Sequence, residues 1–217
     1  MSEVVSISRD GAAAARSALE RTVRSGGVAL FPADGLYGLA CDPLRAGAIA
    51  RIHAIKGRDE GKPSAVLYFS PLTMRELIGS FGERTREAVG RLLPGPLTLV
   101  VSNPERRYPL AAREDPERLG VRLIEGPLSG AGCVLFQTSA NRSGDPAPFR
   151  FGDVEPPVAA AVDLAIDGGE LAGRPSTVVD LTEIEGGGGW RLLREGAVSC
   201  VELERLLAGV PLAKSDQ

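Results

Sequence analysis

Eight short apolar segments limit the folds that this chain can adopt. Each is four to six residues long, is rich in Val, Leu and Ile, and is bounded by residues that favour turns. Such segments are typical of buried β-strands, and six of the eight lie after residue 90. The predicted strands span residues 28–32, 64–69, 97–102, 119–124, 133–138, 162–167, 176–181 and 190–193.

Helical patterns dominate the N-terminal half. Asp42 and Pro43 predict an N-cap followed by proline at the first helical position, and isoleucines at helical spacing extend this helix to Lys56. Ser70 and Pro71 predict a second helix start of the same kind. Helices are expected over residues 11–24, 42–56, 70 onward, 83–93 and 201–209.

The order of these patterns indicates the fold class. No linker-like composition separates the helical half from the strand-rich half, so we expect one domain over residues 1–208 and a disordered tail over residues 209–217. The expected fold is α/β (α+β), with a twisted, open, mixed sheet and flanking helices.

Composition excludes several classes of protein. No stretch approaches the ~18 apolar residues of a membrane span, and the N-terminus lacks a signal-peptide pattern, so we expect a cytoplasmic protein that does not bind a membrane. Cys41, Cys133 and Cys200 are too widely separated for a metal site. The one histidine, His53, is expected to be structural, and no metal ligands are predicted.

Charge is unevenly distributed in a chain whose net charge is −3. Residues 51–122 hold thirteen Lys or Arg against nine acids, whereas residues 123–190 hold three against ten. A basic region in an acidic chain suits a small anionic ligand better than a long polyanion, and an ordinary solvated surface gives the same pattern.

Three cations, Lys56, Arg58 and Lys62, lie where a predicted helix ends and a strand begins. Cations at such a place neutralise a triphosphate or cap the helix C-terminus, and we expect Lys56 and Arg58 to be solvent-accessible. The segment is not a P-loop, because three residues instead of four separate its glycines and Pro63 follows the second lysine.

Two further features place polar or charged groups at or inside apolar strands. Hydroxyl and amide groups at Ser139 and Asn141 follow an apolar strand, where they favour either a ligand site or a polar turn. Arg122 interrupts the apolar strand 119–124 and therefore needs an anionic partner, for which a carboxylate is the natural candidate.

Seven segments, taken in order, resemble the YrdC family of threonylcarbamoyl-AMP synthases over roughly residues 15–200. A single one of them would carry little weight, whereas the ordered set is specific. The segments are PADGLYGLACDP (32–43), IKGRDEGKP (55–63), PGPLTLV (94–100), VR (121–122), QTSANRSGDP (137–146), PSTVVDL (175–181) and LLREGAV (192–198).

The resemblance implies a fold that encloses a large basic cavity for ATP and L-threonine. It implies roles for individual residues: Lys56 and Arg58 in catalysis, Arg58, Lys62, Ser139, Asn141, Pro148 and Arg194 in ATP binding, and Gly35, Leu67, Arg122 and Ser176 in threonine binding.

The amino-acid half of the implied site departs from the family pattern. Where the family usually reads P-T-x-T, this chain has Pro32-Ala33-Asp34-Gly35, so a hydroxyl is missing. Leu67 occupies a position where some members place histidine. Only one short helical segment follows Cys200, which resembles the short, single-domain form of the family.

The implied activity is synthesis of threonylcarbamoyl-adenylate and pyrophosphate from L-threonine, bicarbonate and ATP, with Mg²⁺, for t6A modification at tRNA position 37. Expected partners include tRNA and other proteins of the t6A pathway. Two alternatives stay open. One is a related carbamoyl-adenylate-forming enzyme, and the other is a non-catalytic RNA-binding protein, which the low aromatic content of 5% disfavours.

Overall fold

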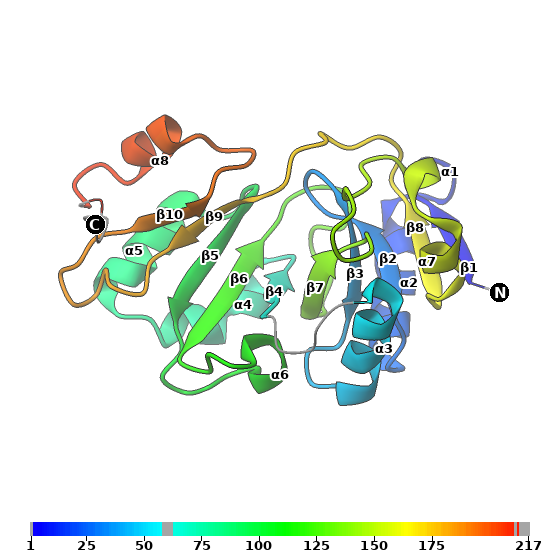
Figure 1. Cartoon of the computed structure of the whole chain (residues 1–217), viewed down its shortest axis with the longest axis horizontal. Helices are drawn as coiled ribbons and strands as arrows, with labels where there is room; N and C mark the ends of the chain where they lie inside the picture. Colours follow the sequence, from blue (N-terminus) through cyan, green and yellow to red (C-terminus); the bar gives the residue numbers. More distant parts are fainter. Residues whose placement is uncertain (1, 58–62, 211, 213–217) are drawn as a thin grey trace.

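A computed structural model describes residues 2–57, 63–210 and 212. Its described strands form one ten-stranded sheet in the order β1-β8-β2-β3-β7-β4-β6-β5-β9-β10 (Figure 1). The strands are β1 (Glu3–Ser6), β2 (Ala29–Pro32), β3 (Tyr37–Cys41), β4 (Ala65–Tyr68), β5 (Leu97–Ser102), β6 (Arg118–Leu123), β7 (Leu135–Ser139), β8 (Leu164–Asp167), β9 (Thr177–Asp180) and β10 (Arg191–Arg194).

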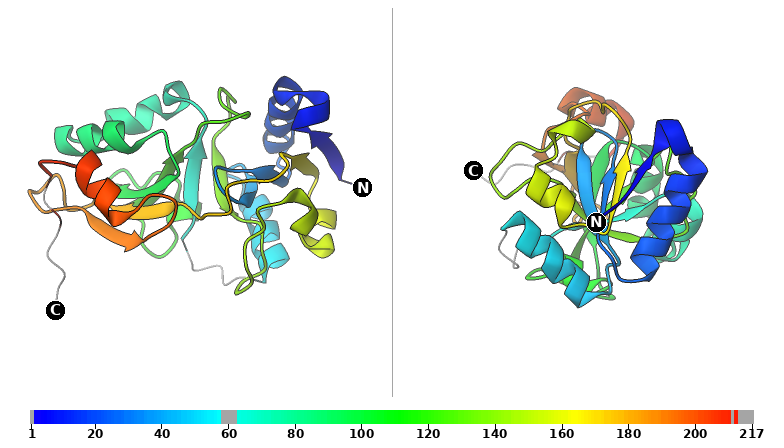
Figure 2. Two further views of the ribbon diagram at one scale, coloured as in Figure 1. Left: turned by 90° about the horizontal axis from the view of Figure 1, so that it is seen from above. Right: turned by 90° about the vertical axis from the view of Figure 1, so that its right-hand side faces the viewer.

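The sheet is mixed and twisted. β2 and β3 form an antiparallel pair, β7 runs antiparallel to both β3 and β4, and β4 runs parallel to β6. At the ends of the sheet, β1 pairs parallel with β8, and β10 pairs antiparallel with β9. Seen along its length, the sheet turns so that the two ends face different directions, as Figure 2 shows. The expected twisted, open, mixed sheet is confirmed.

Helices cover the sheet unequally. One apolar cluster joins one sheet face to buried residues of α3, α4, α5, α7 and α8, whereas the cluster on the opposite face includes α2. The helices are α1 (Ile7–Asp10), α2 (Ala12–Arg24), α3 (Ala46–Lys56), α4 (Pro71–Gly79), α5 (Glu83–Leu92), α6 (Pro109–Ala112), α7 (Pro156–Ala160) and α8 (Cys200–Leu206), with a 3-10 turn η1 (Phe151–Asp153).

Sequence patterns located most of these elements. Every predicted strand is present, with bounds within two residues of those expected. The predicted start of α4 is confirmed, because the Ser70 hydroxyl accepts a hydrogen bond from the Thr73 amide at 3.2 Å. His53 is buried, with its ring 5.9 Å from that of Phe136. The expected tail falls partly on residues 211 and 213–217, which lie outside the described residues.

The predicted start of α3 is wrong. This helix begins at Ala46 with Arg45 as its N-cap, not at Asp42 and Pro43. The Asp42 carboxylate accepts a hydrogen bond from the Leu44 amide at 2.9 Å, and the Asp42 carbonyl accepts one from the Arg45 amide at 3.1 Å. Asp42 thus forms a turn that precedes the helix, because an Asp side chain can bond its own chain two residues on.

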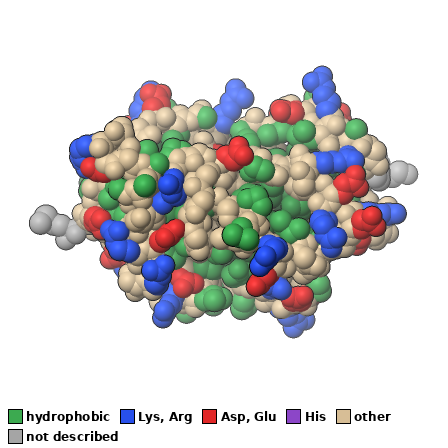
Figure 3. Space-filling model, turned by 180° about the vertical axis from the view of Figure 1, so that it is seen from behind, with side chains coloured by type: hydrophobic (Ala, Val, Ile, Leu, Met, Phe, Trp, Pro, Cys, Tyr) green, Lys and Arg blue, Asp and Glu red, His purple; other side chains and the backbone are tan. Residues whose placement is uncertain are grey.

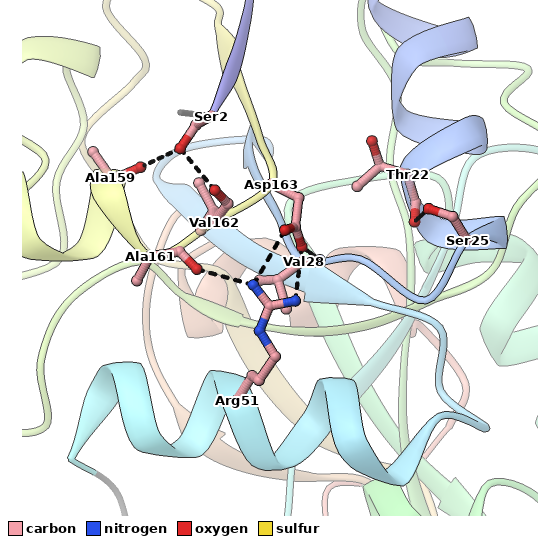
Figure 4. A network of polar contacts seen from close by, with 9 residues as sticks. All are labelled: Ser2, Thr22, Ser25, Val28, Arg51, Ala159, Ala161, Val162 and Asp163. Carbon is pink, nitrogen blue, oxygen red and sulfur yellow. Dashed lines mark hydrogen bonds and ion pairs between the residues drawn. The ribbon is translucent and has the colours of Figure 1, made fainter.

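A polar network ties α3 to the sheet (Figure 4). Arg51 of α3 donates to the Asp163 carboxylate at 2.8 Å and to the Ala161 carbonyl at 3.2 Å. The same carboxylate accepts the Val28 amide at 2.7 Å. The Arg51 hydrogen bond, together with that of Val28, holds the pKa of Asp163 below its ordinary value against the opposing effect of burial. The network therefore holds the residue before β8, Asp163, against the residue before β2, Val28.

On the face opposite to that of Figure 1, Lys and Arg side chains alternate with Asp and Glu, and apolar side chains gather near the middle (Figure 3). This mixture differs from the continuous basic stripe typical of a surface that binds nucleic acid. Among the described residues, no helix combines the length and apolar composition needed to cross a membrane.

Candidate functional site

A cavity of about 360 Å³ opens on the sheet face that carries α2, beyond the part that α2 covers. Side chains alternate between the faces of a strand, so the apolar Leu119, Val121 and Leu123 of β6 face one core while Arg122 faces the cavity. The other strand residues that line the cavity are Tyr37 of β3, Ala65 of β4, Thr98 of β5, Gln137, Thr138 and Ser139 of β7, Val178 of β9 and Arg194 of β10.

Arg122 lies in the middle of this face and has an internal acidic partner. Its guanidinium donates from Nη2 to Asp34 Oδ1 at 2.6 Å and from Nη1 to Gln137 Oε1 at 2.9 Å. The two charged side chains are 8% and 14% exposed. Within the described part of the chain, Arg122 Nε and Asp34 Oδ2 are buried and have no hydrogen-bond partner. The ion pair is therefore incompletely satisfied, with one donor and one acceptor left over.

A second polar group links β10, β9 and β5. Arg194 Nη2 donates to the Ser176 carbonyl at 2.8 Å and to Ser176 Oγ at 3.2 Å. Ser176 Oγ lies 2.8 Å from Thr98 Oγ1, and either hydroxyl can donate. Burial lowers the pKa of Arg194, and the positive charge of Arg122 lowers it further. The two arginines therefore act on the same region, and an anion between them would relieve their repulsion.

Lys56 lies beneath the turn that follows β7. Its ammonium donates to the Ser139 carbonyl, to the Asn141 carbonyl at 2.6 Å and to Asn141 Oδ1 at 3.4 Å. The amide of Asn141 in turn donates to the Asp145 carbonyl at 2.6 Å. Lys56 is 3% exposed, so the expectation that it is solvent-accessible is wrong. Its position at the last residue of α3 lets it hold the turn that carries Ser139.

A strap, defined as residues 168–176, runs from β8 to β9 past one end of the strands (Figure 1). Its residues Arg174, Pro175 and Ser176 line the cavity. The Tyr37 hydroxyl accepts the Gly168 amide at 2.9 Å and donates to the Gly169 carbonyl at 2.8 Å. Burial raises the pKa of Tyr37 to about 12, so the hydroxyl stays neutral. At the other end, the Ala197 amide donates to the Pro175 carbonyl at 2.9 Å.

Gly35 lets the strap approach the sheet. A Cβ at this position would lie 2.0 Å from the Arg174 carbonyl oxygen, and the Gly173 amide donates to the Gly35 carbonyl at 2.9 Å. No side chain fits there without moving the strap. The glycine found in place of the family's second threonine is therefore matched by a strap that occupies the space of the missing side chain.

The structure brings six of the predicted site residues to the cavity wall: Gly35, Arg122, Ser139, Asn141, Ser176 and Arg194. Leu67 is fully buried in the apolar cluster that includes α2, and the cavity residue of β4 is Ala65. Pro148 is buried, and its carbonyl accepts the Tyr37 amide at 2.8 Å, next to the cavity residue Ala147.

The predictions for Arg58 and Lys62 concern residues outside the described ones. The residues at or beside the cavity to which sequence reasoning gave no role include Asp34, Thr98, Gln137 and Arg174. Gln137 carries a readable signal, because it interrupts an apolar strand just as Arg122 does. Asp34 and Arg174 lie in loops and carry none.

The described cavity wall holds three arginines, Arg122, Arg174 and Arg194, and one acid, Asp145. This balance favours anionic ligands. Residues 2–57, 63–210 and 212 contain no group of three or more His, Cys, Asp or Glu arranged to bind a metal ion.

The structure combines a twisted mixed sheet with an arginine-lined cavity whose charge suits small anionic ligands. Comparison with known proteins identifies the family. The profile of the Sua5/YciO/YrdC family, described as "Telomere recombination", matches residues 21–196. The chain belongs to this family.

Two curated relatives are named threonylcarbamoyl-AMP synthase. The threonylcarbamoyl-AMP synthase of Thiobacillus denitrificans is 31% identical over 179 residues, which cover 80% of this chain and 93% of that protein. The threonylcarbamoyl-AMP synthase of Pyrococcus abyssi is 31% identical over 199 residues, which cover 87% of this chain. This chain spans only 56% of the length of the Pyrococcus abyssi protein.

Solved structures share the fold. The structure of P. abyssi Sua5 complexed with L-threonine matches with a TM-score of 0.82 and 28% identity, over 98% of this chain and 62% of that one. E. coli YciO matches with a TM-score of 0.77 over 94% of this chain and 100% of its own, at 24% identity.

Proposed function

We propose that this protein is a threonylcarbamoyl-AMP synthase that converts L-threonine, bicarbonate and ATP to threonylcarbamoyl-adenylate and pyrophosphate. The observation that carries the proposal is the arginine-lined cavity, in a chain 28% identical to a Sua5 whose structure contains L-threonine. Relatives named threonylcarbamoyl-AMP synthase, at 31% identity over most of the chain, support it.

The chemistry requires two bond-forming steps. The amine of threonine combines with bicarbonate, with loss of water, to give N-carboxy-threonine. A carboxylate oxygen of this carbamate then attacks the α-phosphorus of ATP, while the bond from that phosphorus to the bridging oxygen breaks and pyrophosphate leaves. Neither step needs a protein nucleophile. The protein must align three substrates and offset phosphate charge, which preorganised cations do well.

The proposed nucleotide half lies at the turn after β7 and at β10. Arg194 supplies a partly buried cation with donors that Ser176 does not use. Ser139 and Asn141 supply polar contacts, and Pro148 contributes through its loop. Arg58 and Lys62 remain proposed contacts from outside the described residues. Lys56 acts as a positioning residue, since its ammonium is committed to the turn that carries Ser139.

The proposed amino-acid half lies around Arg122. Arg122 binds the threonine carboxylate, and Ser176 contacts the amino acid from the end of the strap. Gly35 contributes by letting the strap lie close to the sheet, since a Cβ there would be 2.0 Å from the Arg174 carbonyl oxygen. Leu67 contributes apolar surface behind the wall.

Mg²⁺ is proposed to enter with ATP. Mg²⁺ is commonly held by one or two carboxylates together with substrate phosphates, and Asp145 is the carboxylate on the described cavity wall. This donor set fits an ion that arrives bound to the nucleotide. The ion would offset charge on the phosphates, while the arginines orient them.

The proposed setting is the cytoplasm, where the product would serve t6A modification at position 37 of tRNA. The unstable adenylate would pass to other proteins of the t6A pathway, with tRNA as the final acceptor. Pyrococcus abyssi Sua5 is longer than this chain, which covers 62% of it.

The decisive experiment incubates purified protein with ATP, labelled bicarbonate and L-threonine, and measures pyrophosphate together with the labelled adenylate. Turnover is expected only when all three substrates are present. Turnover with carbamoyl phosphate and no threonine would identify a related carbamoyl-adenylate-forming enzyme. Absence of turnover combined with tight RNA binding would identify a non-catalytic RNA-binding protein.

A further inference from the structure

The ion pair between Arg122 and Asp34 has an unusual set of unmet hydrogen bonds. Each partner uses only part of its capacity, so that Arg122 Nε lacks an acceptor and Asp34 Oδ2 lacks a donor within residues 2–57, 63–210 and 212. A buried polar atom without a partner costs free energy, about 1–3 kcal/mol. Arg122 lines the cavity and Asp34 lies beside the wall. A ligand that carries both a donor and an acceptor would satisfy these two atoms of opposite type by entering between the two side chains.

We propose that Asp34 binds the amine of the amino-acid substrate while Arg122 binds its carboxylate, so that the two residues together recognise a zwitterion. This inference rests on the proposed function and adds a specificity-determining residue to it. An α-amino acid carries its ammonium and carboxylate on one carbon, and an adjacent acid and base are complementary to that pair.

The charge around the cavity gives an independent reason for an acid at this point. Three arginines and one acid, Asp145, line the described wall, and a positively charged ammonium would be repelled there. Asp145 lies in the loop of Asn141, which is the proposed nucleotide half. Asp34 is the carboxylate beside Arg122, where it offsets the local positive charge.

Backbone hydrogen bonds of the neighbouring residues hold Asp34 in place. Gly35 is held against the strap by the Gly173 amide at 2.9 Å, and the Ala33 amide donates to the Leu36 carbonyl at 3.2 Å. These bonds fix the backbone on both sides of Asp34. A carboxylate fixed in this way binds an amine with little loss of conformational freedom.

A competing role would have the opposite effect on binding. If Asp34 only occupied Arg122 in place of a substrate carboxylate, removal of its charge would free the guanidinium and strengthen the binding of every carboxylate ligand. If Asp34 only oriented Arg122, its removal would weaken all carboxylate ligands equally. Only a role in recognising the amine predicts that removal of the Asp34 charge weakens ligands with an amine and spares ligands without one.

The test is calorimetry with two ligands, L-threonine and 3-hydroxybutanoate, which keeps the carboxylate and hydroxyl of threonine but has no amine. The wild-type protein should bind threonine at least ~10-fold more tightly than 3-hydroxybutanoate, from the usual strength of a charge-assisted hydrogen bond. In Asp34→Asn, threonine binding should fall at least ~10-fold, whereas 3-hydroxybutanoate should bind as well as before or better.

Asp163→Asn is the matched control, because it removes the acid of another Asp–Arg pair, which lies outside the cavity. It should leave the ratio of the two affinities unchanged. If Asp34→Asn fails to fold, the wild-type ratio still decides, and equal wild-type affinities would overturn the proposal. Threonine binding that is unchanged or tighter in Asp34→Asn, or weaker to the same extent for both ligands, would also overturn it.

These results separate the two proposals. A wild-type protein that neither binds threonine nor releases pyrophosphate refutes the proposed function and the role of Asp34 together. A wild-type protein that makes threonylcarbamoyl-adenylate, with an Asp34→Asn variant that does not discriminate by the amine, refutes the role of Asp34 alone.

Discussion

Replacement of Gly35 by alanine tests whether the strap sets the geometry of the cavity. The new Cβ would lie 2.0 Å from the Arg174 carbonyl oxygen. Carbon and oxygen atoms in close contact are about 3.3–3.6 Å apart, so the strap must move by more than about 1 Å. The same strap carries Ser176 into contact with Arg194 and Thr98, and those contacts move with it.

The expected cost has two parts. Overpacking of this kind destabilises a protein by about 1–3 kcal/mol, which for a chain of this length lowers Tm by about 2–12 °C. A displacement of about 1 Å in a binding site costs about 100-fold in rate. Activity should therefore fall much more than stability.

The assay combines thermal unfolding with pyrophosphate release at saturating and limiting threonine. Gly90→Ala in α5 is the control, because its Cβ would meet nothing within 4 Å and alanine is the better helix former. The control should be as active as the wild type and equally stable or slightly more so. A Gly35→Ala variant with wild-type Tm and wild-type kcat/KM would refute the account of the strap.

Three further predictions concern buried or bridging polar groups. Lys56→Met should lower stability by about 2–4 kcal/mol, seen in urea unfolding, because backbone carbonyls lose a charged donor. Thr177→Val should cost about 2–4 kcal/mol by the same measurement, because the Thr177 hydroxyl accepts two amides and donates to the Val198 carbonyl at 2.6 Å. Asp163→Asn should lower Tm by about 2–4 °C at pH 7, because it breaks an exposed pair with Arg51 and weakens one amide bond. The folded-state pKa of Asp163 is lowered, so its contribution is present at neutral pH and is lost as pH falls through that pKa, and the difference in Tm should shrink as the solution is acidified and disappear once the folded-state carboxyl is protonated. A pH-independent difference would contradict this assignment.

The local sequence predicted the position of an element where one face of that element is uniformly apolar. The strand 97–102 alternates Leu97, Leu99 and Val101 toward the core, and the structure has β5 over the same residues. β3 was not predicted, because Gly38 and Ala40 give it weak strand propensity. Pairing with both β2 and β7 holds it in place, and such long-range pairing leaves no mark in a local window.

A site residue could be predicted from the sequence where a charged side chain interrupts an apolar segment. Arg122 met that condition, and its need for an anionic partner followed from burial. The identity of the partner did not follow, because Asp34 is 88 residues away in the chain and meets Arg122 only in the folded sheet. The predicted exposure of Lys56 was wrong because the end of a helix is usually exposed, whereas here the turn after β7 covers the side chain.

The strand order has a consequence for synthesis of the chain. The cavity wall uses β3, β7, β4, β6, β5, β9 and β10, and the last of these strands ends at Arg194. Strands close in space are thus distant in sequence, which makes folding slow relative to proteins with local contacts. A nascent chain that has emerged from the ribosome only as far as β7 lacks both β9 and β10. Ligand binding therefore cannot guide the early stages of folding, and the protein must reach a nearly complete sheet before ATP or an amino acid can stabilise it.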